Sequence, residues 1–329
     1  MRQVNLDCEG PLVKNDIAYE LCESFLPEGG KFFSLISKYD DFLSDIVKRK
    51  NYESGSTLKF ILPFLRIYGV DNKTIKEYSF SHLLPLPGAK ETLSKINKMM
   101  PTFIISTSYS PFIEAFCDFM NFPRGNTYST FLNLDKYRIS KEEVNELKAI
   151  MREILDFSSL EIEEDIQRLD EIFQKKIPFM ECGKILKEVV PLGGKEKSRA
   201  LFDSLKKTGG KLSEVLYAGD SITDVEVLKL VKKGGGIAIS FNGNSYALEA
   251  AEIACISYGT SPLISVAEAF FRGGRKRVLS LVSDCSEGEK GEKKKYILRL
   301  IDKDNIGTLC RESEEVRKKV RGEKLGKLG

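Results

Sequence analysis

The sequence predicts an α/β protein in which a doubly wound parallel sheet carries inserted helical segments. Short apolar, β-branched runs alternate with amphipathic stretches along much of the chain, which is typical of strand–helix–strand units with right-handed crossovers. Two stretches, residues 14–81 and 138–189, interrupt this alternation with helical periodicity alone. With 329 residues, the chain is long enough for a sizeable core and for additional helical units.

The N-terminal part of the chain contains one predicted strand and then only helices. Residues 4–6 form a short apolar run that predicts the first strand. Helical spacing of apolar residues then predicts helices in NDIAYELCESFL, FFSLISKYDDFLSDIVKRK, TLKFILPFLRIYG and NKTIKEYSF. Pro63 is expected to kink or break the third of these helices.

The other predicted strands follow from residue 102 onward. Residues 102–105 predict a strand that ends in hydroxyl side chains, and NTYSTFLNL predicts a strand or one limb of a hairpin. The acidic stretch 138–189 predicts a pair of amphipathic helices, and GGKEKSRALFDSLKKTG predicts a helix entered through glycines. Residues 215–218, GIAISF and EIACIS predict further strands, each followed by a helix.

The C-terminal part, residues 276–329, has a different composition. SEGEKGEKKK is rich in charge and lacks apolar periodicity, although YILRLI has the composition of a strand. These features predict a charged tail that is mobile or loosely docked. Binding of an acidic partner by its basic end is an alternative.

Composition limits the chemistry that this chain can perform. Acids and bases nearly balance at a net charge of +3, so nucleic acid is not an expected partner. No apolar run predicts membrane insertion, and the expected location is cytoplasmic. The seven cysteines are scattered and read as reduced thiols, with Cys8 as a packed thiol at a strand end. His82 is the single histidine and is interpreted as structural, so a multi-histidine zinc site is excluded. The chemistry is expected to come from carboxylates, hydroxyls and lysines, with or without a hard metal ion.

Polar side chains stand where the predicted strands end or where helices begin. Because ligands of parallel α/β sheets bind beyond the carboxyl ends of the strands, these side chains are candidates for one site. They are Asp7 and Glu9 after the first strand, Ser106, Thr107 and Ser108 after the second, Lys195 and Lys197 at a helix start, and Asp220, Ser221 and Asp224 after the strand at 215–218.

The order and local sequence of these segments resemble the haloacid dehalogenase (HAD) superfamily, most of whose members are magnesium-dependent phosphohydrolases. DCEGP stands where that superfamily has D-x-D-G-T, FIISTSY where a Ser or Thr closes a strand, KSRAL where a lysine opens a helix, and GDSITD where it has G-D-x-x-x-D. The S-x-x-aromatic form of the second motif is similar to the phosphoserine-phosphatase-like branch. DCEGPLVKND and FIISTSYSPF also resemble an archaeal group of predicted phosphatases labelled subunit R of energy-converting hydrogenase A, a label that implies a hydrogenase partner.

The resemblance implies a Rossmann-like core and inserted caps. Residues 1–13, 82–137 and 190–275 would form the core, and 14–81 would form a helical cap over the site. The insertion 138–189 is unusual beside such a cap. It is expected to be either a second lid or a face for a homodimer.

The resemblance also implies roles for the candidate residues. Asp7 would be the nucleophile, Glu9 the general acid and base, and Lys197 the cation that keeps Asp7 ionised, with Lys195 as the competing choice for that last role. Ser106 and Thr107, with Lys197, would bind the phosphoryl group of a small phosphorylated metabolite. Mg²⁺ would be held by Asp7, the main-chain carbonyl of Glu9 and Asp220, with Asp224 in direct or water-mediated contact.

Two departures from the family pattern leave alternatives open. Glu9 stands in place of an aspartate and is one methylene longer, and Pro11 stands in place of a threonine. Glu9 is therefore a working acid, a misplaced acid, or part of a site that only binds phosphate. The alternatives to a phosphatase are a phosphotransferase or mutase on the same scaffold, and a non-catalytic binding or assembly subunit that retains the fold.

Overall fold

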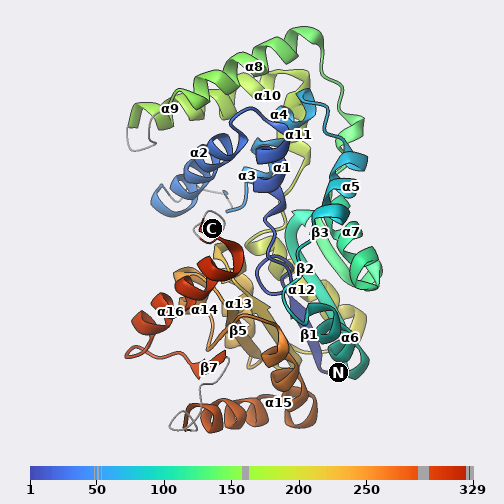
Figure 1. Cartoon of the computed structure of the whole chain (residues 1–329), viewed down its shortest axis with the longest axis vertical. Helices are drawn as coiled ribbons and strands as arrows, with labels where there is room; N and C mark the ends of the chain where they lie inside the picture. Colours follow the sequence, from blue (N-terminus) through green and yellow to red (C-terminus); the bar gives the residue numbers. More distant parts are fainter. Residues whose placement is uncertain are drawn as a thin grey trace.

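The fold is built on one large sheet with helices on both of its faces (Figure 1). The computed structural model describes residues 1–47, 49, 52, 54–157, 163–287, 296–323 and 326. Within these residues the sheet has seven strands in the order β3-β2-β1-β4-β5-β6-β7. The strands are β1 (Gln3–Leu6), β2 (Thr102–Tyr109), β3 (Thr127–Thr130), β4 (Val215–Gly219), β5 (Ile237–Phe241), β6 (Ile253–Ser257) and β7 (Tyr296–Leu300).

All neighbouring strands from β3 to β6 are parallel, as the alternation of strands and helices predicts. Strands β1, β4, β5 and β6 are buried along their whole length, because helices cover both faces of the sheet. One face packs against α6 and α15, and the other against α12, α13 and α14. The bounds are α6 (Ala89–Met99), α7 (Ser110–Met120), α12 (Lys195–Thr208), α13 (Val225–Lys233), α14 (Ser245–Ala250) and α15 (Ser261–Glu287). The predicted doubly wound α/β fold is confirmed.

The two helical insertions pack against each other and form one helical body above the sheet (Figure 1). Phe173 of the second insertion lies between Tyr39 and Phe60 of the first, with ring centroids 5.8 and 4.6 Å away. We use "helical body" for α1 (Ile17–Phe25), α2 (Gly29–Asp41), η1 (Phe42–Ile46), α3 (Thr57–Phe60), α4 (Leu62–Ile67), α8 (Lys141–Leu155), α9 (Glu163–Glu171), η4 (Ile172–Lys176), α10 (Ile177–Phe179), η5 (Glu181–Gly183) and α11 (Lys184–Glu188). Residues 158–162 of the second insertion lie outside the described part of the chain.

Helix α5 (Asn72–His82) was predicted as part of the cap but lies along the core helix α7. Lys76 pairs with Glu114 at 3.1 Å, and the rings of Phe80 and Phe119 are 6.1 Å apart. The connections within the core contain the short turns η2 (Arg124–Asn126), η3 (Leu134–Lys136), η6 (Leu212–Glu214) and η7 (Ile222–Asp224).

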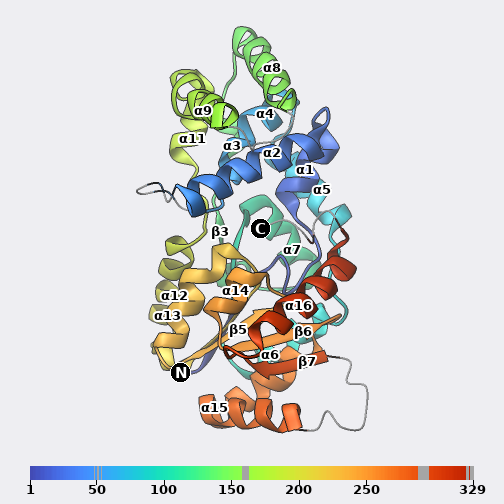
Figure 2. The same cartoon turned by 90° about the vertical axis from the view of Figure 1, so that its left-hand side faces the viewer.

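The C-terminal segment is part of the core, so the expectation of a loosely docked tail is wrong for its described residues. Strand β7 pairs antiparallel with β6 over five residues, from Ile253–Leu300 to Ser257–Tyr296. Helix α16 (Ile306–Arg321) then packs on the sheet, and both views show its C-terminal end directed toward the helical body (Figure 2). Most of SEGEKGEKKK, residues 288–295, lies outside the described residues.

The reason for this error lies in the buried stripe of α16. Its buried residues are Leu309, Ser313 and Arg317, spaced four apart, and two of the three are polar. Because polar side chains occupy two of these three buried positions and charged residues fill many of the others, its sequence resembles that of a solvated helix. None of the helices in the described part of the chain combines the length and apolar composition that a membrane crossing requires.

Candidate active site

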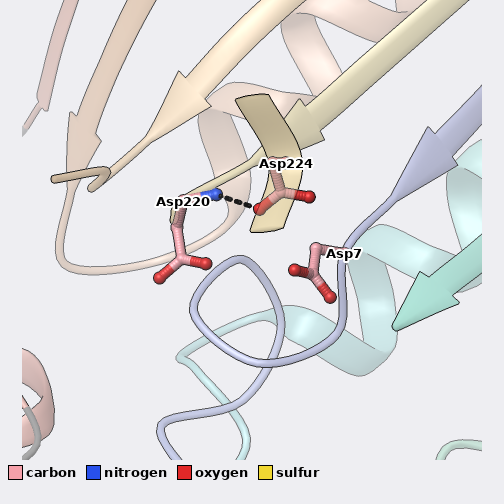
Figure 3. A group of neighbouring side chains, drawn as sticks. All are labelled: Asp7, Asp220 and Asp224. Carbon is pink, nitrogen blue, oxygen red and sulfur yellow. Dashed lines mark hydrogen bonds between the residues drawn. The ribbon is translucent and has the colours of Figure 1, made fainter. Parts of the chain in front are cut away.

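The carboxyl ends of β1 and β4 bring three aspartates together (Figure 3). Asp7 follows β1 and Asp220 follows β4, and these two strands are neighbours in the sheet. Asp224 lies in turn η7, and its Oδ2 accepts the N–H of Asp220 at 3.0 Å. One oxygen of each carboxylate lies within 4.8 Å of the others, and all three residues are buried.

Asp7 lies at the centre of this group. Its Oδ1 accepts a hydrogen bond from the N–H of Cys8 at 2.6 Å, and its Oδ2 accepts one from Lys197 Nζ at 2.5 Å. Burial raises the pKa of the Asp7 carboxyl well above its usual value, and the charges of Asp224 and Asp220 add to this while Lys197 opposes it. An added positive charge beside Asp7 would therefore favour the ionised form.

Lys197 is fully buried on the first turn of α12. Its Nζ donates to Asp7 and, at 2.7 Å, to Asp224 Oδ1. Burial alone would lower the pKa of this ammonium group, but the two carboxylates raise it above its usual value. Lys195 is exposed at the start of the same helix. Of the two candidate lysines, it is therefore Lys197 that lies against Asp7.

Asp224 has both oxygens occupied. Besides Lys197, Oδ1 accepts the hydroxyl of Tyr217 at 2.6 Å, and Oδ2 accepts the N–H groups of Asp220 and Ser221 at 3.0 and 3.2 Å. Burial would raise the pKa of this carboxyl, but Lys197 and these donors hold it below its usual value. Asp224 is thus suited to hold Lys197 and the loop after β4, and, like Asp7, whose two oxygens also accept hydrogen bonds, it stays a candidate metal ligand.

The remaining groups fit a hard divalent cation. Mg²⁺ takes oxygen ligands and keeps several waters, so Asp7 and Asp220 with main-chain oxygens suffice. Gly10, at a φ of +93°, passes so close to Asp220 that a Cβ there would collide with the carboxylate carbon. The loop after β1 and the end of β4 therefore form one cradle. The Glu9 carboxylate is outside the group of three aspartates, so only its main-chain carbonyl remains a candidate ligand.

Glu9 is directed to the helical body and not to the aspartates. Its Oε1 accepts the N–H of Ile17, the first residue of α1, at 2.7 Å. Burial raises the pKa of the Glu9 carboxyl well above its usual value, and nearby Asp16 adds to this, whereas the Ile17 N–H and Arg321 oppose it. A carboxyl group that holds its proton in this way can donate it.

The end of β2 contributes hydroxyl groups, but the residues at the cavity are Thr107 and Ser108 and not the predicted Ser106 and Thr107. Thr107 and Ser108 line the cavity beside Asp7. Ser106 is fully buried and is not among its lining residues; its Oγ donates to Ser108 Oγ at 3.1 Å and accepts the Ser108 N–H at 3.2 Å. The structure thus adds Ser108 to the candidate phosphoryl-binding residues, and it places Ser106 behind Ser108.

A cavity of about 120 Å³ lies between the core and the helical body. Its lining combines residues of both units. From the core these are Asp7, Glu9, Thr107, Ser108, Asp220, Ser221, Ile222, Thr223, Arg317 and Arg321, and from residues 16–58 they are Asp16, Ile17, Ala18, Phe33, Ser37, Asp40, Asp41, Gly55, Thr57 and Leu58. The helical body therefore closes the site from above.

A family model for haloacid dehalogenase-like hydrolases matches residues 72–259 of this chain. The chain belongs to the haloacid dehalogenase-like hydrolase family. The matched range contains the candidate residues of the second, third and fourth motifs, whereas Asp7 and Glu9 lie outside it.

Among solved structures, a gene product from Archaeoglobus fulgidus is similar at 29% identity and a TM-score of 0.88, over 100% of this chain and 99% of its own. A phosphoserine phosphohydrolase-like protein from Francisella tularensis subsp. tularensis is 17% identical, with a TM-score of 0.48, over 81% and 99% of the two chains. A substrate-bound phosphoserine phosphatase is 14% identical, with a TM-score of 0.48, over 77% and 91%. A comparison with curated proteins found no match.

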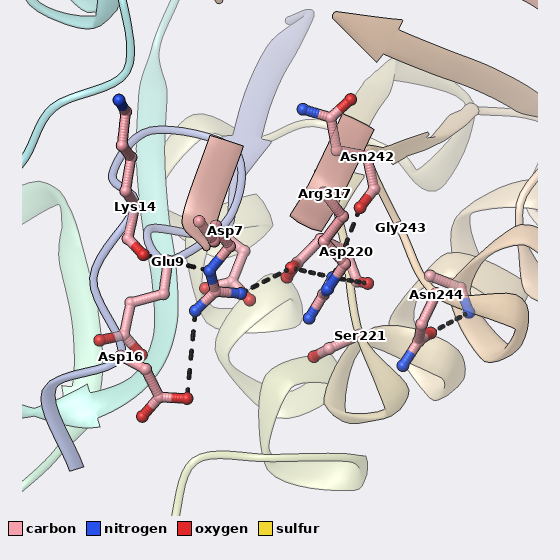
Figure 4. Close-up of polar contacts among 12 residues, drawn as sticks. Asp7, Glu9, Lys14, Asp16, Asp220, Ser221, Asn242, Gly243, Asn244 and Arg317 are labelled. Atoms are coloured by element: carbon pink, nitrogen blue, oxygen red, sulfur yellow. Dashed lines mark hydrogen bonds and ion pairs between the residues drawn. The ribbon is translucent and has the colours of Figure 1, made fainter. Parts of the chain in front are cut away.

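The site of this haloacid dehalogenase-like hydrolase also contains residues that none of the sequence motifs indicates. Arg317 of α16 reaches Asp220 Oδ2 at 2.6 Å (Figure 4). Arg321 of the same helix lies 3.4 Å from the same oxygen. Burial raises the pKa of the Asp220 carboxyl, and these two arginines oppose the rise. The only signal in the sequence is the four-residue spacing of two arginines in a helix.

Cys8 and His82, for which the sequence predicts structural roles, lie outside the candidate active site. Cys8 is fully buried, as expected for a packed thiol, and burial raises its pKa well above its usual value. His82 is exposed at the end of α5, where its ring stacks on Tyr78 at 4.1 Å. Neither side chain lines the described cavity.

Proposed function

We propose that this protein is a magnesium-dependent phosphohydrolase that cleaves a small phosphate monoester through an aspartyl-phosphate intermediate. One observation carries the proposal. Asp7 lines a cavity with one oxygen on the buried Lys197, and a second carboxyl, Glu9, whose pKa is raised, lines the same cavity. A nucleophile beside a cation, with a second carboxyl of raised pKa in the same cavity, is the arrangement that phosphoryl transfer through a carboxylate needs.

In the first step an oxygen of Asp7 would form a bond to phosphorus as the bond from phosphorus to the ester oxygen breaks. Glu9 would give its proton to that departing oxygen, so the product leaves as a neutral alcohol. Thr107 and Ser108, with Ser106 behind them, would bind phosphoryl oxygens, and Lys197 would hold Asp7 in its ionised, attacking orientation.

In the second step Glu9, now ionised, would take a proton from a water molecule that attacks phosphorus, and Asp7 would be released together with inorganic phosphate. Mg²⁺, when bound at Asp7 and Asp220, supplies charge that offsets the repulsion between the anionic nucleophile and the anionic substrate. Asp224 would act behind this group by holding Lys197 in place.

The proposal includes the setting of the reaction. The small cavity and its closure by the helical body support a small phosphorylated metabolite as substrate, bound with water excluded. We also propose a cytoplasmic enzyme without a nucleic-acid partner. Association with a hydrogenase and formation of a homodimer through the second insertion remain separate predictions.

The direct test is phosphate release from an aryl phosphate and from a panel of small phosphorylated metabolites. We expect turnover that requires Mg²⁺ and stops with EDTA, and we expect Asp7→Asn to remove it. Water as the phosphoryl acceptor distinguishes a hydrolase from a phosphotransferase or mutase. A folded preparation without metal-dependent turnover on any substrate of the panel would favour a binding subunit instead.

Lys197 and Lys195 provide a matched pair on one helix. We expect Lys197→Met to lower kcat by about 10³-fold or more, because it removes the buried cation at Asp7. Lys195→Met removes the same charge from an exposed position and should change kcat by no more than about twofold. A larger loss in Lys195→Met than in Lys197→Met would contradict the assignment.

A further inference from the structure

Helix α16 brings a buried cation to the site from the end of the chain. Its N-terminal half is fixed to the core, since Leu309 packs with Leu248 and Ala254, and Ser313 Oγ donates to the carbonyl of Gly243 at 2.6 Å. One turn further along the same stripe, Arg317 is 3% exposed. The helix is therefore positioned by its own packing, and the arginine is held at the place where the stripe meets the cavity.

Arg317 makes its described contacts with the end of β4 and the loop after β5 (Figure 4). Its Nη1 donates to Asp220 Oδ2 at 2.6 Å, to the Asp220 carbonyl at 3.0 Å and to the Asn242 carbonyl at 3.4 Å. A guanidinium is planar and permanently charged, so these contacts place a fixed positive charge on a carboxylate that lines the cavity.

Arg321, one further turn along, connects the same carboxylate to the entrance of the helical body. Its Nη1 lies 3.4 Å from Asp220 Oδ2, its Nε donates to the Lys14 carbonyl at 3.1 Å, and its Nη2 donates to the Asn15 carbonyl at 2.9 Å. Lys14 and Asn15 lie in the linker between β1 and α1. Two side chains of one helix therefore meet at Asp220 from different directions.

The charges of the site explain why such a cation matters. Asp7, Asp220 and Asp224 are buried together, and Lys197 pairs with the first and third but not with Asp220. Without α16, Asp220 would be offset by a bound divalent cation and by Lys197, which is paired with the other two aspartates. With Arg317 present, part of the negative charge of Asp220 is neutralised before any divalent cation binds. The anion-binding side of the cavity is therefore more positive.

We propose that Arg317 is a positioning residue of this active site, which acts through Asp220 to weaken the binding of Mg²⁺ and to strengthen the binding of a phosphoryl anion. This inference rests on the proposed function, because it assumes that Mg²⁺ and a phosphoryl group meet at Asp220. Its physical reason is Coulombic: a fixed positive charge repels a second cation and attracts an anion. A residue that only anchored α16 would have no such opposed effects.

The test measures the two affinities separately by titration calorimetry on the full-length protein, at one fixed pH for all variants. The ligands are Mg²⁺ alone, and inorganic phosphate in the presence of saturating Mg²⁺. For Arg317→Met we expect the Mg²⁺ affinity to rise about tenfold and the phosphate affinity to fall about tenfold, which corresponds to one charge-assisted interaction. Arg317→Lys keeps the charge and should restore most of the phosphate affinity.

Two further variants keep the outcome clear. Lys319→Gln removes a positive charge from an exposed position of the same helix and should leave both affinities unchanged. Arg321→Met removes the charge that is farther from Asp220, so it should shift both affinities in the same directions as Arg317→Met but by less. Because an unfolded protein cannot bind Mg²⁺ more tightly, a gain in Mg²⁺ affinity also reports an intact site.

The inference is overturned if Arg317→Met lowers both affinities, if it changes neither, or if the wild-type protein binds neither ligand. If Arg317→Met does not fold, Arg321→Met decides in its place by the sign of its two shifts. Turnover is measured separately on the wild type. Mg²⁺-dependent turnover with unaltered affinities in the variants would refute the inference alone, whereas absent turnover with the expected opposed shifts would refute the proposed function alone.

Discussion

Replacement of Glu9 by glutamine tests the proposed mechanism at its most specific point. Glutamine can keep the hydrogen bond to the Ile17 N–H, since its amide oxygen accepts as Oε1 does at 2.7 Å. The substitution therefore removes the transferable proton and leaves the link between the loop after β1 and helix α1. General acid–base groups contribute about 10²–10⁴-fold, so we expect kcat to fall by that factor with KM little changed.

The aspartate variant tests the reach of the same group. Glu9→Asp shortens the side chain by one methylene and withdraws the carboxyl from Ile17. A displacement of about 1 Å can cost about 10²-fold when the geometry is tight. We therefore expect kcat to decrease in the order wild type, Glu9→Asp, Glu9→Gln. A variant Glu9→Asp that is faster than wild type would instead mean that the longer acid is misplaced.

The assay is steady-state release of phosphate with saturating Mg²⁺, and Glu20→Gln provides the control. Glu20 is a second carboxyl with a raised pKa, but its oxygens accept from the Asn15 amide and the Asp16 N–H outside the cavity lining. We expect its rate within about twofold of wild type. Rates of wild type and Glu9→Gln that agree within about twofold would refute the role of Glu9 as acid and base.

Two other predictions concern the metal site and the dependence of stability on pH. Gly10→Ala should weaken Mg²⁺ binding about tenfold or more in calorimetry, because its Cβ would collide with Asp220, whereas Gly209→Ala, at positive φ in open space, should not alter it. Burial raises the pKa of Glu20 from 4.5 to about 7, opposed by Asn15, so the folded state keeps this proton longer than the unfolded chain. That stabilisation is present below about pH 4.5 and is lost as pH rises through 7, so the free energy of unfolding should fall by on the order of 3 kcal/mol over this range. In Glu20→Gln this fall should be absent. Urea unfolding measured across the range checks it, and an equal fall in wild type and Glu20→Gln would contradict it.

The sequence was sufficient for the elements whose stability is local or follows from a repeated pattern. Buried parallel strands are nearly continuous apolar runs, so β4, β5 and β6 could be predicted from composition and spacing, whereas β1 was indicated by Val4 and Leu6 alone. The carboxyl ends of parallel strands meet at one edge of the sheet, and this rule by itself predicts that Asp7 and Asp220 lie close together. The order of the four motifs then indicated the family that the match over residues 72–259 shows.

Other features depend on which surfaces meet, and no local pattern encodes that. Ser106 and Ser108 have the same side-chain chemistry and lie on one strand, and only the cavity distinguishes Ser108 as a lining residue. The two helical insertions are separated by the core segment between them, yet Phe173 packs between Tyr39 and Phe60 in one body. Apolar stripes predict that a helix is buried but not against which partner.

The end of the chain shows this limit most clearly. The sequence by itself determined an acidic site at the ends of β1 and β4, since those residues immediately follow their strands. Only the tertiary structure decided that Arg317, 97 residues beyond Asp220, would complete it. The physical reason is that a buried charge is stabilised by a partner that folding brings to it, so its helix needs no apolar stripe at that position and resembles a solvated tail until the partner is known.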